Sequence, residues 1–438
     1  MTYALPADLA ELIIDQWHTY VSRAGAPPPP AIPRQRQLRW ILETIFFASL
    51  EREEGRELKF TVCCGSRPIL RDGSLEQIPL IPFITRRPLS VASLRSLAPA
   101  VRPDAGAILV ELLFDFDDRE EANIVGVLHV GGDYANARAG KSFYYQQPPF
   151  ALTVEVRGPG ELHVYQGAIK LAILNSGVLE GPNTLSALDY FPAHEILKDG
   201  EDKLMSRINP PAHEPPSEWA TFQWIALLNC VLSVVNSIKA NAHGGTLLLI
   251  QPSNVEQMPL RFKYELTSDA NFLDDRFISF INTRHEVGDA FFMQENNLDG
   301  VPSSDEIAKL QLTLVAKERE LGDAVGTVAM FSGVDGALAL TSDLRVLGFG
   351  AEILLEKAAP TQVFEVFGET FAPKQTNELD SESFGMRHRS AVRFVGSVTG
   401  AVAFVVSQDG RVSLCWNKDG TVYIKRGVNI ANPNMAGA

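Results

Sequence analysis

Cysteine is scarce in this 438-residue sequence: there are four, and none shows the C-x-x-C spacing that is typical of zinc sites and redox centres. Cys63, Cys64, Cys230 and Cys415 are therefore predicted to be small, buried, reduced side chains and not metal ligands or disulfide partners. This use of cysteine favours a reducing compartment.

The sequence also lacks an excess of basic charge, an export signal and a long apolar run. It has 39 Lys and Arg against 53 Asp and Glu, a net charge of −14. That balance argues against a surface for duplex nucleic acid or an anionic membrane, because both need dense positive charge. The opening "MTYALPADLAELI" has no basic segment, and the longest apolar run, "WIALLNCVLSVV", is too short to span a bilayer. We therefore expect a cytoplasmic protein with neither nucleic acid nor a membrane as its partner.

The motifs of several large enzyme classes are missing. "ARAGKS", residues 137–142, contains the Lys-Ser pair of a phosphate-binding loop, but Ala135 stands where the first glycine is required. The histidines lack the paired spacing of zinc hydrolases, and there is no Gly-x-Ser-x-Gly turn. Any chemistry therefore depends on a different set of residues.

Hydrophobic periodicity predicts two domains with a boundary after Met205. Residues 1–205 begin with helices near 7–23 and 34–52 and continue in strand-like runs such as "LKFTVCC" and "AILVELLFDF", which indicates an α+β domain. "SRINPPAHEPPSEW", residues 206–219, contains four prolines among polar residues and is predicted to be the interdomain linker.

Residues 206–438 are predicted to form an α/β domain with a mixed sheet and flanking helices. A long apolar helix leads into the buried strand "GGTLLLI", and charged helical sequence follows over about 271–320. The final third is predicted to alternate strands and tight turns, in "GTVAMFSG", "GALALTSDLRVLGFG" and "GAVAFVVSQDGRVSLCW".

A cluster of basic residues, "GMRHR" at 385–389, directly precedes "SAVRFVGSVTG", which is predicted to be a helix. Free amides and the helix dipole favour an anion at such a terminus. The positive charges of Arg387 and Arg389 are unfavourable beside the positive end of the dipole unless a bound anion neutralises them. Both arginines can donate two hydrogen bonds to phosphate, and His388 can donate, accept or bind a metal. The alternative is a structural role in which these side chains pair with acids such as Glu382 or Glu352.

Two further stretches place polar groups at strand ends. Asp335 precedes the small residues Gly336 and Ala337 at the start of a predicted strand, where a bulky ligand could approach the backbone. An ordinary Asp-Gly turn is the alternative interpretation. Ser407 and Gln408 follow the buried strand "AVAFVV".

In this order, "DGA" at 335–337, "G-x-RHR" at 385–389 and "VVS" with a polar residue at 405–408 resemble the diadenylate cyclase domain. The resemblance is strong over about 328–417 and weaker over 219–250, and it does not cover the N-terminal half. It implies the condensation of two ATP molecules to cyclic di-3′,5′-AMP with release of two pyrophosphates, using Mn²⁺ or Mg²⁺. It also implies an N-terminal sensor domain that regulates the cyclase.

The resemblance implies a role for each matching residue. Asp335 would activate the 3′-hydroxyl and lie beside the metal with His388, while Arg387 and Arg389 would hold phosphates. The residues implied to contact the nucleotide are Gly336, Ala337, Leu354, Gly385, Met386, Ser407 and Gln408. Among them, Gly336 and Ala337 leave space, and the backbone around Leu354 faces the adenine edge.

Two positions depart from the family pattern. Met386 stands where the family has threonine, and Gln408 stands where it has glutamate. An inactive protein that only senses adenine nucleotides is therefore the alternative function. For an active enzyme, one domain offers residues for one triphosphate, so we expect two copies to associate face to face for catalysis.

Overall fold

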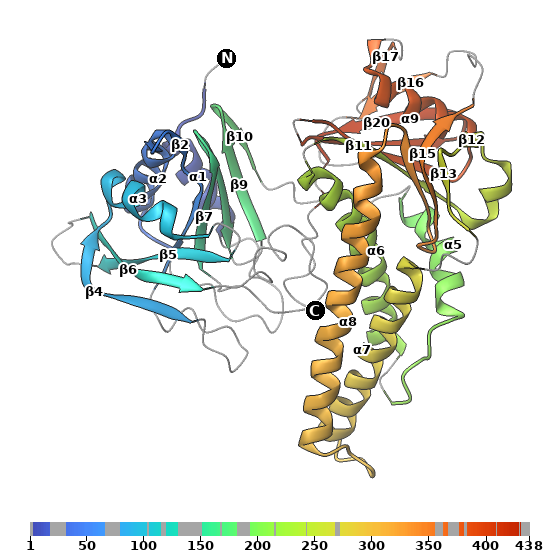
Figure 1. Cartoon of the computed structure of the whole chain (residues 1–438), viewed down its shortest axis with the longest axis horizontal. Coiled ribbons are helices and arrows are strands. Elements are labelled where there is room, and N and C mark those ends of the chain that lie inside the picture. Colours follow the sequence, from blue (N-terminus) through green and yellow to red (C-terminus); the bar gives the residue numbers. More distant parts are fainter. Residues whose placement is uncertain are drawn as a thin grey trace. The chain divides into compact units, whose positions relative to one another are not determined.

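The computed structural model (Figure 1) divides into two compact units. The first comprises most of residues 1–182, and the second comprises residues 183–432 and a short segment, 140–144. The structure describes residues 3–17, 32–65, 79–102, 105–114, 120–129, 151–166, 169–181, 193–213, 216–241, 243–267, 272–354, 362–366, 376–380, 383–408, 410–428 and 430. The "ARAGKS" stretch and Glu382 lie outside these residues.

The first unit contains an eight-stranded sheet with the strand order β10-β9-β8-β7-β3-β5-β6-β4. Its helices are α1 (Pro6–Trp17), α2 (Gln35–Leu50) and α3 (Val91–Leu97). The strands are β1 (Arg52–Glu53) and β2 (Arg56–Glu57), which form a separate pair, and β3 (Phe60–Cys64), β4 (Leu80–Pro88), β5 (Gly106–Phe114), β6 (Glu120–His129), β7 (Leu152–Gly158), β8 (Glu161–Gln166), β9 (Ile169–Asn175) and β10 (Val178–Glu180). Among the strand pairs that the structure describes in this sheet, β3–β5 alone is parallel.

The core of the first unit lies between one face of this sheet and the helices. Leu9 and Ile13 of α1 and Ile41 of α2 are fully buried in one cluster with alternate strand residues such as Phe60 and Val62. The apolar residues of the helices recur at helical spacing and those of the strands at every second position, so both sets face the same core. The α+β prediction for the first domain is confirmed.

The second unit contains a ten-stranded mixed sheet with the order β12-β15-β14-β11-β18-β19-β20-β16-β17, and β13 pairs with β15. Its helices are α5 (Ala193–Met205), α6 (Pro216–Ala240), α7 (Leu273–Glu295), α8 (Ser304–Met330) and α9 (Met386–Ser397). The strands are β11 (Gly245–Ile250), β12 (Leu260–Arg261), β13 (Tyr264–Glu265), β14 (Ala337–Thr341), β15 (Val346–Ile353), β16 (Val363–Val366), β17 (Thr376–Leu379), β18 (Ala401–Val406), β19 (Val412–Lys418) and β20 (Thr421–Arg426). The predicted α/β class with a mixed sheet is confirmed.

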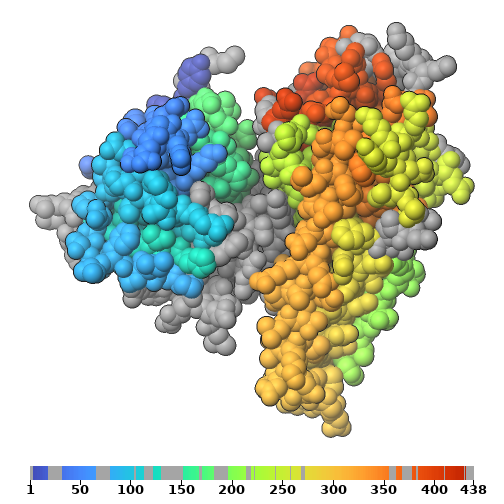
Figure 2. All heavy atoms as spheres, viewed as in Figure 1, coloured from blue at the N-terminus to red at the C-terminus, as the bar shows by residue number. Residues whose placement is uncertain are grey.

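Both faces of this sheet are covered. Leu247 and Leu249 of β11 pack in the cluster that contains α5, α6, α7 and α8, whereas Leu248 and Ile250 pack in the cluster that contains α9. The alternation follows from the period of two along a strand. In Figure 1, α9 accordingly lies on the other side of the sheet from α6 and α8, and the α7–α8 hairpin extends well beyond the sheet. The same hairpin projects as a gold-orange column in Figure 2.

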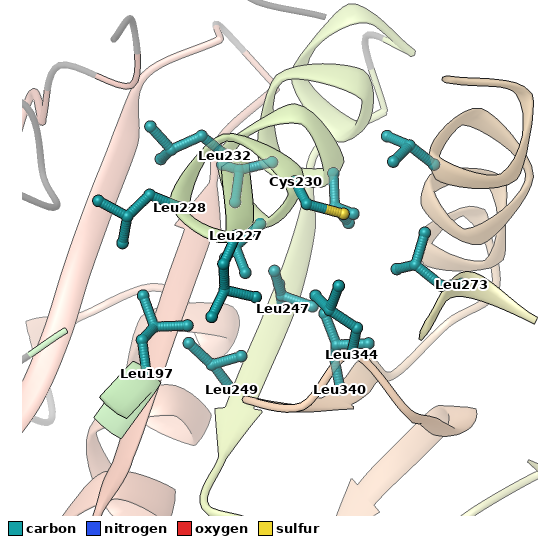
Figure 3. Packing of buried hydrophobic residues seen from close by; sticks show 14 of the residues in the cluster. Leu197, Leu227, Leu228, Cys230, Leu232, Leu247, Leu249, Leu273, Leu340 and Leu344 are labelled. Carbon is teal, nitrogen blue, oxygen red and sulfur yellow. The ribbon is translucent and has the colours of Figure 1, made fainter. Parts of the chain in front are cut away.

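The boundary between the two units differs from the sequence-based boundary after Met205, because α5 packs in the second unit. Ile196, Leu197 and Leu204 of α5 are buried in its core, and Leu197 lies beside Leu227 and Leu249 (Figure 3).

The described residues of the proline-rich stretch, 206–213 and 216–219, are likewise part of the second unit. Asn209 N donates to Asn282 Oδ1 at 2.9 Å, and the backbone amides of Ala212 and His213 donate to the Asp289 carboxylate at 2.6 and 2.8 Å.

One predicted strand is wrong: "GTVAMFSG", residues 326–333, forms the last turns of α8 and a short 3-10 turn. Val325, Val328 and Ala329 are buried at helical spacing against the core, which favours helix over strand. The apolar helix α6 has a 19-residue stretch, Phe222–Ala240, that is long and apolar enough to cross a membrane. However, 72% of an 18-residue window within this stretch is buried inside the protein. Core helices have the same composition.

Candidate functional site

Three neighbouring strands of the second sheet place the predicted site residues at one edge. β14 runs parallel to β11, and β18 runs antiparallel to it, with Gly245 opposite Val406. The starts of β14 and β11 and the end of β18 therefore lie together. Asp335 immediately precedes Gly336 and β14, and Ser407 immediately follows β18.

Leu354 also belongs to this edge. β15 is antiparallel to β14, with Ala337 opposite Ala351, so the end of β15 lies beside the start of β14. Leu354 follows β15 directly; the residue is 51% exposed, and its amide donates to the carbonyl oxygen of Pro259 at 2.8 Å.

Helix α9 begins at the same edge, because Arg387 in its first turn contacts His243, which precedes β11 by two positions. Gly385 is its N-cap and provides no side-chain hydrogen bond to the first turn, and a Cβ at this glycine would meet nothing within 4 Å. Met386, the first helical residue, is 77% exposed. The amides of the first turn are therefore not capped by the N-cap side chain, which suits an anion.

Arg387 links this helix to the strand ends. Its Nη2 donates at 3.2 Å to the carbonyl oxygen of His243, two positions before β11 begins. A Cβ at Gly244, where φ is +66°, would lie 2.9 Å from Arg387 Nη1 and 3.2 Å from the backbone nitrogen of Gln408. Gly244 thus allows the guanidinium and the turn after β18 to approach the same point.

Asp335 is exposed, and the backbone that follows it is closely packed. Gly336 has φ +123°, and a Cβ there would lie 2.4 Å from the carbonyl carbon of Gly350, so only glycine fits. Lys263 Nζ donates to the carbonyl oxygen of Asp335 at 2.9 Å. The carboxylate is thus presented from a constrained loop at the sheet edge.

His388 is half-buried between α9 and the sheet. Its Nε2 forms a 3.0 Å hydrogen bond with Ser413 Oγ on β19, and its ring centroid lies 6.2 Å from that of Phe384. Burial, and then the positive charge of Arg426, lower the pKa of His388. The imidazole is therefore neutral near pH 7, and the positive charge of the "RHR" stretch comes from its arginines.

The structural alternative, in which the "RHR" residues pair with Glu352, is wrong for that acid. Glu352 lies on β15 and forms its ion pair with Arg261 of the neighbouring β12. This ion pair lowers the pKa of Glu352.

Ser407 and Gln408 form the tight turn between β18 and β19. The amide of Ser407 donates to the carbonyl oxygen of Arg411 at 2.8 Å, and the amide of Gly410 donates to that of Ser407 at 2.9 Å. Gln408 is exposed at this turn, so its side chain is available to a ligand at the edge.

A divalent ion would need ligands from outside the protein at this edge. Within the ranges that the structure describes, no three His, Cys, Asp or Glu side chains lie close enough to hold a metal. The exposed carboxylate of Asp335 fits an ion that retains water and phosphate ligands, as Mg²⁺ commonly does. At Nε2 of His388, a metal would have to replace Ser413.

Comparison with known proteins gives a match in the first unit. Residues 27–129, a range that ends with β6, match the family described as "Probable sensor domain DACNV". The first unit resembles a sensor domain. DACNV is the N-terminal sensor domain of diadenylate cyclases, so the likeness links the chain to these enzymes. The match does not reach the sheet edge of the second unit, and no curated protein matches the chain.

Three residues at the edge were missed by the sequence analysis. The Gly-Gly pair before β11 indicated only a turn, although Gly244 allows the close approach of Arg387. Lys263 and Ser413 lie in unremarkable stretches, and their contacts with Asp335 and His388 join residues 72 and 25 positions apart. No local pattern could have indicated them.

Proposed function

We propose that the second unit is a diadenylate cyclase that condenses two ATP molecules to cyclic di-3′,5′-AMP and two pyrophosphates. The observation that supports this most is the common sheet edge at which Asp335, the open N-terminus of α9 and the turn at Ser407 lie together. These are the positions at which the sequence resembles the diadenylate cyclase domain.

The proposed chemistry needs positioning and neutralisation of charge more than covalent participation of the protein. Each 3′-oxygen attacks the α-phosphorus of the other ATP; an O–P bond forms, the bond to the β-phosphate oxygen breaks, and pyrophosphate leaves. The proton of each 3′-hydroxyl passes to the Asp335 carboxylate and then to solvent. Arg387 and Arg389 offset the negative charge of the triphosphate.

A divalent ion, Mn²⁺ or Mg²⁺, would supply Lewis-acid stabilisation of the phosphates when bound. In this proposal Asp335 provides the protein carboxylate for it, with His388 close by. Gly336 and Ala337 leave space for the nucleotide, the backbone at Leu354 faces the adenine edge, and Gly385 and Met386 present the first amides of α9. Ser407 and Gln408 face the triphosphate from the turn after β18.

Two copies of the chain are needed in this proposal, because one edge holds one ATP and the product joins two. A two-fold arrangement brings both 3′-oxygens into line with the opposite α-phosphorus. The first unit, which resembles a sensor domain, would regulate the cyclase. We place the enzyme in the cytoplasm, in keeping with its buried cysteines.

The second candidate function is an adenine-nucleotide sensor without turnover. It is favoured by Met386 and Gln408, which replace a hydroxyl and a carboxylate of the related family. The deciding experiment is incubation of the full chain with ATP and Mn²⁺ or Mg²⁺, followed by chromatography of the products. Cyclic di-AMP and pyrophosphate in a one-to-two ratio support the cyclase, whereas bound ATP without product supports the sensor.

A test of regulation can use the structural boundary. A fragment that starts near residue 183 retains α5, which belongs to the core of the second unit. Turnover that responds to conditions in the full chain but not in this fragment supports regulation by the first unit. Equal turnover of both under every condition contradicts it.

A further inference from the structure

A lysine outside every motif of the sequence reaches the loop that presents Asp335. Lys263 Nζ donates to the carbonyl oxygen of Asp335 at 2.9 Å, across 72 positions of the chain. Lys263 is exposed, and it lies between the short strands β12 and β13, both of which pair with β15. An ammonium group has three donors, so one bond to a carbonyl leaves two for a ligand.

The position of this ammonium is set by the packing of the lysine stem. The amide of Lys263 donates to the carbonyl oxygen of Gly350 at 3.3 Å, and a Cβ on Gly350 would lie 3.0 Å from Lys263 Cβ and 3.1 Å from its Cδ. Gly350 in turn contacts Gly336, the residue after Asp335. The stem therefore crosses β15 at a glycine and directs the charge to the sheet edge.

The charges around Asp335 indicate why a cation is needed at the position of Lys263. The other basic group of the same segment, Arg261, is paired with Glu352. Arg387 of α9 contacts His243 before β11, whereas the loop at Asp335 adds a further negative charge at this edge. A nucleotide phosphate that approaches Asp335 needs a nearby cation, because two like charges at short range repel strongly.

We propose that Lys263 is a further substrate-binding residue of this site, whose ammonium bridges the Asp335 carbonyl and a phosphate oxygen of the bound nucleotide. The inference rests on the proposed function, because it assumes ATP at the edge between β14 and α9. Its ligand class is a nucleoside di- or triphosphate, and a nucleoside without phosphate gains nothing from this contact.

The test compares the affinities of ATP, ADP and adenosine for the full chain by calorimetry. Lys263→Met retains most of the stem and removes the charge, Lys263→Arg retains the charge, and Lys309→Met, at an exposed position on α8, is the matched control. We expect Lys263→Met to weaken ATP and ADP about tenfold, as for hydrogen bonds to charged groups, and to change adenosine by less than about twofold. Lys263→Arg should retain most of the affinity, and the control should equal the wild type.

The kinetic readout separates this role from a purely structural one. If product forms, Lys263→Met should raise the KM for ATP more than it lowers kcat, with an unchanged unfolding midpoint. Unchanged ATP affinity, or an equal loss for ATP and adenosine, overturns the proposal for Lys263. If the wild type binds ATP but makes no product, the proposed cyclase function is refuted, and the binding comparison still tests the role of Lys263. If the wild type binds no ATP, both the cyclase function and the role of Lys263 are refuted.

Discussion

Arg387 donates from Nη2 to the carbonyl oxygen of His243 at 3.2 Å, which joins the first turn of α9 to the start of β11 across 144 positions of the chain. The guanidinium also lies against Gly244, where a Cβ would come within 2.9 Å of Nη1. Arg387 is thus oriented before any ligand binds, and its remaining donors are placed at the edge where Asp335 and Gln408 also lie.

Replacement of Arg387 by lysine should therefore weaken ATP binding although the charge is retained. A lysine cannot donate to the His243 carbonyl and to a phosphate with the geometry of a guanidinium. We expect about a tenfold rise in the Kd for ATP with a change in unfolding free energy below about 1 kcal/mol, because the side chain is exposed. Calorimetry and urea unfolding measure the two quantities; an unchanged Kd would contradict the phosphate-binding role.

Asp335→Asn should abolish product formation while ATP still binds. The substitution keeps the shape of the side chain and removes its capacity to take a proton, which is worth at least about a hundredfold in rate for positioned acid–base groups. The control is Asp323→Asn, at an exposed position on α8. Turnover of the Asp335→Asn protein at the wild-type rate would exclude this carboxylate from the chemistry.

Catalysis by pairs of chains should be visible in the dependence of activity on enzyme concentration. Specific activity should rise at low concentration and then reach a plateau, because each product molecule needs two sites. Addition of Asp335→Asn chains to the wild type should reduce activity beyond simple dilution, since mixed pairs cannot complete both bonds. Constant specific activity at concentrations where the chain is monomeric, shown by light scattering, would refute the two-site arrangement.

Two glycines inside helices should respond in opposite directions to alanine. A Cβ at Gly200 of α5 would lie 2.1 Å from the carbonyl carbon of Ser342 in the β14–β15 turn, whereas a Cβ at Gly326 of α8 would meet nothing within 4 Å. Gly200→Ala should lower the unfolding free energy by about 1–3 kcal/mol, and Gly326→Ala should raise it by up to about 1 kcal/mol through helix propensity. Urea unfolding of both variants checks this, and a neutral Gly200→Ala would mean that α5 does not pack on the turn.

The first unit should lose stability in mild acid because of His163. Burial, only partly offset by the hydrogen bond that Glu161 Oε1 accepts from His163 Nε2, lowers the pKa of His163 to about 4. The unfolded chain gains a proton below about pH 6.5 that the folded unit excludes, so stability falls between about pH 6.5 and 4 by at most roughly 3 kcal/mol.

His163→Gln should flatten this pH dependence. Urea unfolding at about pH 7 and about pH 5 compares the variant with the wild type, and His213→Gln, at an exposed position, serves as the control. If the wild type and His163→Gln lose the same stability between the two pH values, another group causes the acid sensitivity.

Local patterns in the sequence were sufficient for the elements that hold the candidate motifs. Helical periodicity after "GMRHR" predicted α9 with the basic residues in its first turn, and alternation around "DGA" predicted the β14–β15 hairpin. Both depend on interactions within a few residues, which the order of side chains determines directly. The burial of the four cysteines was also predicted correctly from the sequence.

Tertiary packing determined the boundary between the units, the helical state of residues 326–333 and the contacts within the candidate site, because these depend on residues far apart in the sequence. Helix α5 belongs to the second unit because Leu197 packs against β11, and residues 326–333 are helical because Val328 and Ala329 face that same core. The contacts of Arg387 with His243 and of Lys263 with Asp335 span 144 and 72 positions. Such contacts exist only after the strand order β15-β14-β11-β18 has formed, since no local preference determines which strands become neighbours.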